Sequence, residues 1–289
     1  MKNVLITGAT GNVGIEVIKA LQKISHDLNV CAGVRNLEKN EQLFKDYAVK
    51  LIKFDFTDFS TFENALQSCE ILFLLRPPQI SNTEKYFKPL IEVAKAKKIK
   101  HIIFISVQGA EKNSFIPHHK IEKLISESGI PYTFLRPAYF MQNFLTTLHQ
   151  DLLKKYIFLP SGNAKFTVID VRDIAKVTVK ILLDVPNHLF KCYELTNNEQ
   201  LSFQEMADIL SEVLEEEITY KSPNLLKFIY QKRKEGQPFV YIFVLIFLHY
   251  FPRFQKPPQN SNWVQNITGI EPTEFKQFVK DFRVKLLKP

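Results

Sequence analysis

Three glycines near the start of the chain, Gly8, Gly11 and Gly14, are the residues best placed to do chemistry. They follow the apolar run Val4–Ile6, and the segment after them has the apolar period of an amphipathic helix. Glycine permits a sharp strand-to-helix turn, backbone contact with a diphosphate and close helix–strand packing, and the free amides at a helix N-terminus bind anions. The spacing predicts a dinucleotide site rather than an ordinary turn, formed by Gly8, Thr10, Gly11, Asn12, Val13 and Gly14.

The choice of dinucleotide depends on the residues that end the second predicted strand, 30–34. No carboxylate stands there to hold the ribose 2′-hydroxyl of NAD, whereas Arg35 follows the strand directly and Lys39 comes four residues later. An arginine can stack on adenine and form two hydrogen bonds with a 2′-phosphate. NADP(H) is therefore favoured over NAD(H), and a merely solvated loop arginine is the less favoured interpretation.

Further cofactor contacts are predicted where the later strands end, because parallel sheets bind ligands beyond the carboxyl ends of their strands. An acid after the third strand can accept a hydrogen bond from the adenine amino group, and residues after the fourth and fifth strands would line the ribose and nicotinamide. The predicted contacts are Asp55, Phe56, Leu75, Arg76, Ser106, Val107 and Gln108.

These residues are positioned by alternating strands and helices in the first half of the chain. Strands are predicted over 4–7, 30–34, 50–54, 71–75, 102–106 and 132–135. Helices are predicted near 13–24, 38–46, 60–67, 84–97 and 118–128. Such alternation implies a parallel sheet with helices on both faces. The predicted fold class is α/β: a Rossmann-type doubly wound parallel sheet with a smaller C-terminal α/β substrate lobe.

The pattern changes after Pro137, where shorter elements follow. Helices are predicted over 139–153, 170–183 and 203–214, the last opened by a capping box of Ser202 and Glu205. Short strands are predicted over 156–159, 192–196 and 218–220. We therefore expect a dinucleotide-binding domain over residues 1–153 and a substrate lobe over 154–289, interleaved with the end of the sheet.

The segment 238–251, PFVYIFVLIFLHYF, contains no Lys, Arg, Asp or Glu and is apolar on nearly every side of a helix. It is too short to span a bilayer, which takes about 20 residues. A helix buried in the lobe, a lid over an apolar substrate or a subunit contact is favoured. The less favoured alternative is an interfacial membrane helix, because cations at 232–234 precede the segment and Arg253 and Lys256 come at its end.

The composition excludes several classes of protein. With 45% hydrophobic and 24% charged residues, the chain is not disordered. Its three cysteines, Cys31, Cys69 and Cys192, are scattered, so neither a metal site nor a disulfide framework is expected. No signal peptide precedes the first strand, and a cytoplasmic protein is expected. Residues 219–289 hold 12 Lys/Arg against 4 Asp/Glu and so carry the whole net charge of +8. A solvated surface is favoured there over binding to nucleic acid, anionic lipid or an acidic partner.

Several motifs in order resemble the NmrA-like family of atypical short-chain dehydrogenases/reductases, which includes NADPH-dependent quinone and triphenylmethane-dye reductases. The N-terminal marks are the turn over 7–14 and the run Val34-Arg35-Asn36 with Lys39. Later marks are HHKIE at 118–122, SGIPYTFLRP at 128–137, YFMQN at 139–143, IDVRDIA at 169–175, YELT at 193–196, and Thr268-Gly269 with Pro272 and Phe275. The resemblance covers nearly the whole chain.

The resemblance also implies a departure from ordinary short-chain dehydrogenases, which use Tyr-x-x-x-Lys. Aligning on Glu122 places Ser114 at the tyrosine position and His118 at the lysine position. A serine hydroxyl cannot act as an acid at neutral pH as a lysine-assisted phenol does. His118 and Tyr139 are the candidate catalytic residues: the first for a hydrogen bond to a ribose hydroxyl, the second, or water, for any proton that is needed.

By this resemblance, the chain is expected to be an NAD(P)H-dependent oxidoreductase that transfers hydride to a quinone-like or other conjugated apolar acceptor. The predicted substrate pocket contains Tyr139, Phe140, Asn143 and Phe144, although core packing explains Tyr139 and Phe140 equally well. The alternative is a non-catalytic NAD(P)-binding redox sensor that acts through a protein partner. A sugar-nucleotide epimerase is disfavoured because it needs the missing tyrosine. Neither the physiological substrate nor the oligomeric state follows from the sequence.

Overall fold

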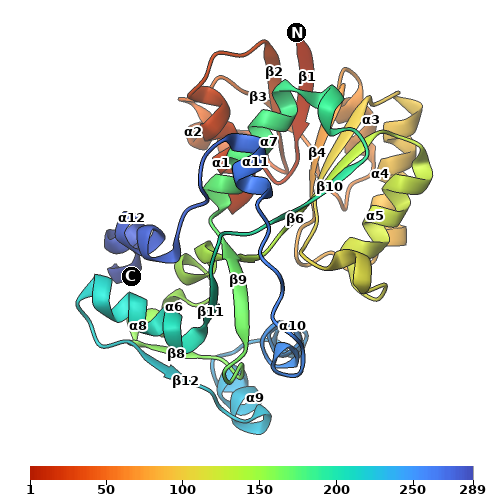
Figure 1. Ribbon diagram of the computed structural model, residues 1–289. Helices are drawn as coiled ribbons and strands as arrows, with labels where there is room; N and C mark the ends of the chain where they lie inside the picture. The colour runs from red at the N-terminus through yellow and green to blue at the C-terminus, as the bar shows by residue number, and fades with distance from the viewer. Residues whose placement is uncertain (289) are drawn as a thin grey trace. The chain divides into compact units, whose positions relative to one another are not determined.

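The computed structural model describes residues 1–288 and divides into two compact units, each built from three stretches of the chain (Figure 1). The first unit contains residues 1–137, 171–195 and 263–270, and the second contains 138–170, 196–262 and the chain from 271 onward. The predicted division at residue 153 does not follow these units, because the chain returns to the first unit twice after leaving it.

The first unit is built on a seven-stranded sheet in which every neighbouring pair is parallel, in the order β10-β6-β5-β4-β1-β2-β3. The strands are β1 (Lys2–Ile6), β2 (Leu28–Val34), β3 (Lys50–Lys53), β4 (Ile71–Leu75), β5 (His101–Ile105), β6 (Tyr132–Pro137) and β10 (Lys191–Leu195). The six strands predicted in the first half of the chain are confirmed. The strand predicted over 192–196 is not part of the lobe: it is the edge strand β10, paired with β6.

Helices cover both faces of this sheet. They are α1 (Asn12–Gln22), α2 (Leu37–Phe44), α3 (Ser60–Leu66), α4 (Thr83–Ala96), α5 (Pro117–Ser128), α7 (Val171–Leu183) and α11 (Trp263–Thr268), with short 3₁₀ helices η1 (Ala110–Lys112) and η3 (Val185–His188). Figure 1 shows α1 and α7 packed together on one side and α4 and α5 on the other. The helix predicted over 170–183 is α7, and it belongs to this unit rather than to the lobe.

Because all seven strands run the same way, their carboxyl ends lie at one edge of the sheet. The strand order reverses between β1 and β4, which makes that edge the switch point at which doubly wound sheets bind their ligands. The predicted α/β Rossmann-type fold is confirmed. A ligand-binding site is expected at the loops after β1, β2, β4 and β5.

The second unit combines small sheets with helices. Its strands are β7 (Tyr139–Phe140), β8 (Tyr156–Phe158), β9 (Lys165–Ile169), β11 (Gln200–Ser202) and β12 (Thr219–Lys221), which pair as β11-β9-β7 and β12-β8. Its helices are α6 (His149–Leu153), α8 (Phe203–Leu214), α9 (Leu225–Lys234), α10 (Phe239–His249) and α12 (Phe275–Leu287), with η2 (Met141–Leu145) and η4 (Phe251–Phe254). The predicted capping box is confirmed: Ser202 Oγ accepts from the amide of Glu205, whose Oε2 accepts from the amide of Ser202.

One prediction for the second unit was wrong, and one alternative of another was. A continuous helix was expected over 139–153, but strand β7, the turn η2 and the short helix α6 occupy those residues, because Thr146 leaves the helical conformation at φ −132° and ψ −90°. The segment 238–251 was favoured as a buried helix, a lid or a subunit contact. Helix α10 buries only one side, through Ile242, Leu245, Ile246 and His249, and its other side is exposed, so it is not a buried helix. The lid and the subunit contact stay predictions.

Candidate functional site

The turn from β1 to α1 has room only for glycine at two of its predicted positions. Gly8 has φ +61°, and a Cβ there would lie 2.7 Å from Cδ2 of Leu75. A Cβ on Gly14 would lie 2.3 Å from the carbonyl oxygen of Gly8, a contact that neither backbone could relieve without moving. The turn closes through the amide of Gly11, which donates to Gly8 O at 2.9 Å. Because the turn is tight and its glycines carry no side chains, a ligand can approach its backbone before the N-terminus of α1. We refer to this backbone surface as the cradle.

The N-terminus of α1 offers its amides to an anion. Gly11 is the N-cap, no side chain caps the helix, and no acidic residue stands in the first turn. The first amides of a helix have no partner within it, and the helix dipole places partial positive charge there. The predicted contacts Thr10, Asn12 and Val13 all lie in this turn or at the start of α1. The arrangement suits a phosphate group.

Thr7, which was not among the predicted contacts, ties the turn to the neighbouring strand end. Its buried hydroxyl donates to the carbonyl of Phe73 at 3.1 Å and accepts from the amide of Leu75 at 2.9 Å. The side chain of Leu75 in turn packs against Gly8. The ends of β1 and β4 are thereby held together at the switch point. A threonine that ends a strand before a glycine turn is the only signal in the sequence for this role.

The two predicted cations after β2 are exposed. Within residues 1–288, neither Arg35 nor Lys39 forms an ion pair, so both are available to a ligand. Asn36 between them caps α2 by accepting from the amide of Lys39 at 2.8 Å. Glu38 lies in the same turn of α2, but no carboxylate occupies the end of the strand itself.

The residues after β3 are divided between surface and core. Asp55 is half-buried, and its Oδ1 accepts from both the amide and the hydroxyl of Thr57 at 2.8 Å, which makes a tight turn. Phe56 points into the core, where its ring lies 5.0 Å from those of Phe54 and Phe87. The side chain of Phe56 therefore packs the unit, and only its backbone can serve as the predicted cofactor contact.

Arg76 and His118 were predicted separately, and the structure brings them together. Arg76 Nε donates to Nε2 of His118 at 3.3 Å, and its NH1 donates to the carbonyls of Pro77, Pro78 and Ile80. Burial, with Arg76 adding to it, lowers the pKa of His118 to about 3. The ring is therefore neutral, and because Nε2 accepts, Nδ1 carries the proton. His118 can donate a hydrogen bond, but it is not an acid–base group at neutral pH.

The loop that follows β5 carries the last predicted cofactor contacts. Ser106 is buried, and among the described residues its hydroxyl has no hydrogen-bond partner. Val107 and Gln108 are half-buried, and the amide of Gln108 donates to the carbonyl of Pro137 at 2.9 Å. A buried hydroxyl without a partner is costly in a finished core. Its presence after a central strand fits a ligand that supplies the missing partner.

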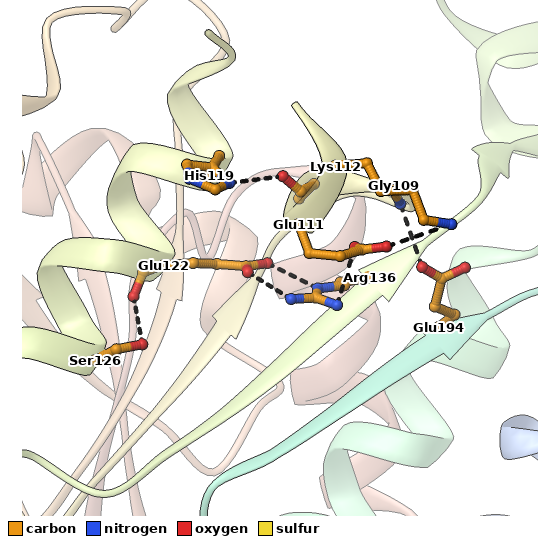
Figure 2. A network of polar contacts seen from close by, with 9 residues as sticks. Gly109, Glu111, Lys112, His119, Glu122, Ser126, Arg136 and Glu194 are labelled. Carbon is orange, nitrogen blue, oxygen red and sulfur yellow. Dashed lines mark hydrogen bonds and ion pairs between the residues drawn. The ribbon is translucent and has the colours of Figure 1, made fainter. Parts of the chain in front are cut away.

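A network of charged residues holds the loop that follows β5 (Figure 2). Arg136 on β6 forms two hydrogen bonds with Glu122 on α5, at 3.0 and 2.7 Å, and an ion pair with Glu111 at 3.0 Å. Glu194 on β10 accepts from the amide of Gly109 at 3.3 Å. Glu122 is buried, so the pair is shielded from solvent. The network joins α5, β6 and β10 to η1, and none of its members was predicted as a site residue.

The predicted substrate residues lie in the second unit. The hydroxyl of Tyr139 bonds to Nε2 of His249 at 3.2 Å; since His249 donates from Nδ1 to the carbonyl of Leu245 at 2.8 Å, Nε2 is the acceptor. Burial raises the pKa of Tyr139. A phenol that already donates to His249 is a poor proton donor. Phe140 and Asn143 are half-buried, but Phe144 is fully buried between Phe203 and Phe275 and packs the core of the unit.

The second unit also contains an open cavity of about 500 Å³ beside α6, α9 and α10, and sequence reasoning gave no sign of it. None of the four predicted substrate residues lines this cavity. Its wall includes Lys232, which bonds to Asp151 at 3.0 Å and to Glu235 at 2.9 Å. Within residues 1–288, no group of three His, Cys, Asp or Glu side chains could hold a metal ion.

Three features of the first unit thus fit a dinucleotide: a glycine turn that a Cβ would fill, uncapped amides at the start of α1, and the partnerless hydroxyl of Ser106. Comparison with known proteins agrees with this geometry. The model of the NmrA-like family matches residues 1–261.

Individual relatives extend the match to nearly the whole chain. The prestalk A differentiation protein A of Dictyostelium discoideum is 29% identical over 282 residues, which cover 96% of this chain and 92% of that protein. An NAD(P)H azoreductase of Xenophilus azovorans is 31% identical over 212 residues, 72% of each chain. A solved NADPH-dependent quinone oxidoreductase of Escherichia coli, in complex with NADPH, is 23% identical with a TM-score of 0.83 and covers 96% of this chain and 99% of its own. This last likeness shows that the fold is shared.

Proposed function

The chain belongs to the NmrA-like family, and from this premise we propose that it is an NADPH-dependent oxidoreductase acting on a quinone-like or other conjugated apolar compound. The observation that carries the proposal is the cradle before α1, where the glycine turn and uncapped amides suit a diphosphate. The names of similar proteins support the reaction class, since one is an azoreductase and another a quinone oxidoreductase.

The cofactor is proposed to be NADP(H) rather than NAD(H) because of the cations after β2. Arg35 and Lys39 are exposed and unpaired within the described part of the chain, so both can bind a 2′-phosphate without breaking an existing ion pair. A 2′-hydroxyl would offer these cations no charge to bind.

The exchange Arg35→Asp tests this preference. It removes a cation and introduces a carboxylate where a 2′-hydroxyl could be held, so the Kd for NADPH should rise at least about 10-fold, the loss of one charge-assisted contact of about 1.5 kcal/mol or more. The Kd for NADH should change less. Fluorescence titration with both cofactors measures the effect, with Lys95→Glu on the exposed side of α4 as a charge-matched control. Equal weakening of both cofactors would contradict the assignment.

When bound, NADPH would supply the hydride, and the residues around it would bind and orient rather than transfer protons. His118 stays neutral and can donate from Nδ1 to a ribose hydroxyl, with Arg76 holding its ring. Tyr139 is engaged with His249, so we assign to water any proton that the reduced acceptor takes up. A conjugated acceptor suits such a site, because positioning alone lowers much of the barrier to hydride transfer.

The experiment that tests the proposal is NADPH oxidation at 340 nm with a panel of quinones, azo dyes and triphenylmethane dyes, run beside a direct NADPH titration. Turnover above the rate without protein is expected for at least one acceptor. The unfolded chain at the same concentration controls for reduction by free thiols, since the protein has three cysteines.

The second candidate function is a redox sensor that binds NAD(P) without turnover and acts on a protein partner. The observation that favours it is the lack of a proton donor, since His118 is neutral and the Tyr139 hydroxyl is already bonded. A sensor would bind NADPH tightly in the titration and oxidise none of it with any acceptor in the panel.

A further inference from the structure

The side of α10 that faces away from the core of its own unit is an apolar stripe. Its members recur with helical spacing, three and four residues apart, and each is about half exposed or more: Val240 78%, Phe243 63%, Val244 48% and Phe247 48% in α10, followed by Phe251 49% at the start of η4. The buried stripe of the same helix lies opposite. A helix that is apolar on both sides in water is unstable unless something covers its outer side.

The neighbouring helix continues this apolar surface. Helices α9 and α10 contact each other, and α9 exposes Leu226 by 81% and Tyr230 by 69%, four residues apart on one side. Phe254, just after α10, is 71% exposed. We refer to the exposed stripe of α10 with Leu226, Tyr230 and Phe254 as the α9–α10 patch.

The patch has a basic border. Lys227, Arg233 and Lys234 of α9 and Arg253 and Lys256 beyond α10 are exposed, and within residues 1–288 none of them pairs with a carboxylate. The one carboxylate between residues 219 and 270 is Glu235, which Lys232 binds at 2.9 Å. The border therefore carries positive charge with nothing to balance it.

Cations also lie over aromatic rings at both ends of α10. The guanidinium of Arg233 is 4.4 Å from the ring centre of Phe239, and that of Arg253 is 5.2 Å from the ring centre of Tyr250. Long basic side chains that lie along apolar surface with their charge at its edge are typical of helices at a lipid–water boundary.

We propose that the α9–α10 patch docks the protein on an anionic lipid bilayer, with α10 lying in the plane of the interface. The helix has 11 residues and is about 17 Å long, far short of the roughly 30 Å of a bilayer core, so it can lie on a membrane but not cross it. The apolar stripe would enter the boundary between headgroups and acyl chains, and the five cations would meet the lipid phosphates.

A second copy of the chain fits the patch less well. A symmetric dimer would place the patch against itself and bring the two basic borders together, which like-charge repulsion opposes. A protein partner fits less well too, because the side chains of the α10 stripe carry no polar atom, whereas protein interfaces average about one hydrogen bond per 100–200 Å². An anionic lipid bilayer matches both features, because its acyl chains can take up the apolar stripe and its headgroups can bind the basic border.

Cosedimentation of the full chain with vesicles tests the proposal. At about 50 mM salt, binding to phosphatidylcholine vesicles with 30% phosphatidylserine should be at least 10-fold stronger than binding to phosphatidylcholine alone, and it should weaken as salt is raised. The double exchange Phe243→Glu with Phe247→Glu should reduce binding at least 10-fold. Both side chains are exposed, so the fold should persist, and circular dichroism checks this.

Two controls separate the contributions of the stripe and the border. Val284→Glu changes an exposed apolar residue of α12 and should leave binding unchanged. Arg253→Glu with Lys256→Glu should remove the preference for anionic vesicles, whereas Lys280→Glu on α12 should not. Vesicle binding needs neither NADPH nor turnover, so it can succeed even if the proposed reductase activity fails.

Either of two results would overturn the proposal. One is a protein that stays in the supernatant with both kinds of vesicle at low salt, or whose binding is unaffected by the Phe243 and Phe247 exchanges. The other is a dimer in sedimentation velocity that those exchanges convert to monomer while no vesicle binding is seen, which would assign the patch to a second copy.

Discussion

At the scale of single residues, two of the three glycines of the β1–α1 turn, Gly11 and Gly14, are expected to behave differently. A Cβ at Gly14 meets the backbone of Gly8 at 2.3 Å, whereas a Cβ at Gly11 meets it at 3.2 Å and Gly11 has ordinary φ of −85°. Gly14→Ala should therefore lower the free energy of unfolding by about 1–3 kcal/mol, as overpacking does. Gly11→Ala should keep nearly native stability but weaken NADPH binding at least about 10-fold, because the methyl group stands where a phosphate approaches the backbone.

Thermal denaturation and NADPH titration of the two variants measure this difference. The two variants serve as controls for each other, since each adds the same methyl group three residues apart. If both lose stability and binding in parallel, the glycines act only through the fold, and the separate phosphate role of Gly11 is wrong.

Residue positions that depend on backbone geometry could be predicted from the sequence, and the directions of side chains could not. The glycine turn and the cations after β2 follow from strand ends, which the apolar pattern locates. Phe56 and Phe144 were predicted as ligand contacts because of their place in the chain, but both point into a core. The pairing of Arg76 with His118 joins positions 42 residues apart, and no local pattern reveals such a contact.

At the scale of elements, the network behind the β5 loop is expected to matter for cofactor binding. Arg136→Met removes the two hydrogen bonds to Glu122 and leaves that buried carboxylate unpaired. Stability should fall by about 3 kcal/mol or more, and the KM for NADPH should rise because the loop loses its support. The control is Arg283→Met, which removes an exposed pair with Glu215 and hydrogen bonds to the carbonyls of Val213 and Leu214 but leaves no buried charge unpaired, so its loss of stability should be much smaller.

Urea denaturation and steady-state kinetics distinguish the two variants. If Arg136→Met loses stability but keeps a normal KM for NADPH, the network supports the fold and not the site. A conservative exchange, Arg136→Lys, keeps the charge without the forked geometry and should give an intermediate KM.

The alternation of strands and helices was sufficient to predict the first six strands and the fold class, because each element carries its own apolar period. Local pattern could not say which unit a later element joins. Helix α7 and strand β10 follow the first short elements of the second unit, yet they complete the first unit through contacts with α1 and β6. The apolar pattern of 238–251 could not decide between a buried helix and one with an exposed side, because it is the same on nearly every side of the helix.

At the scale of the whole molecule, each unit contains a fully buried neutral histidine, which should make stability depend on pH. Burial lowers the pKa of His101 in the first unit and of His249 in the second, each to about 4. In the unfolded chain a histidine titrates near 6.5, so the unfolded state takes up the proton more readily. This contribution to stability is complete above about pH 6.5 and is lost as the pH falls towards 4. At pH 5 each histidine should cost about 2 kcal/mol.

Thermal denaturation at pH 7.5, 6 and 5 measures this dependence. His249→Gln should flatten the slope between pH 6.5 and 5 even if it lowers stability at pH 7.5, because the titrating group is gone. An unchanged slope in His249→Gln would contradict a neutral His249.

The interleaving of the two units has a consequence for how the protein is made. The last segment of the cofactor-binding unit is residues 263–270, where α11 packs on α7 and β10. A ribosome must therefore translate as far as residue 270 before this unit can close, and nascent chains stopped earlier lack α11. No single cut in the gene separates the two units: a fragment that contains all of the first unit also contains residues 138–170 and 196–262 of the second, and a fragment that contains all of the second also contains residues 171–195 and 263–270 of the first.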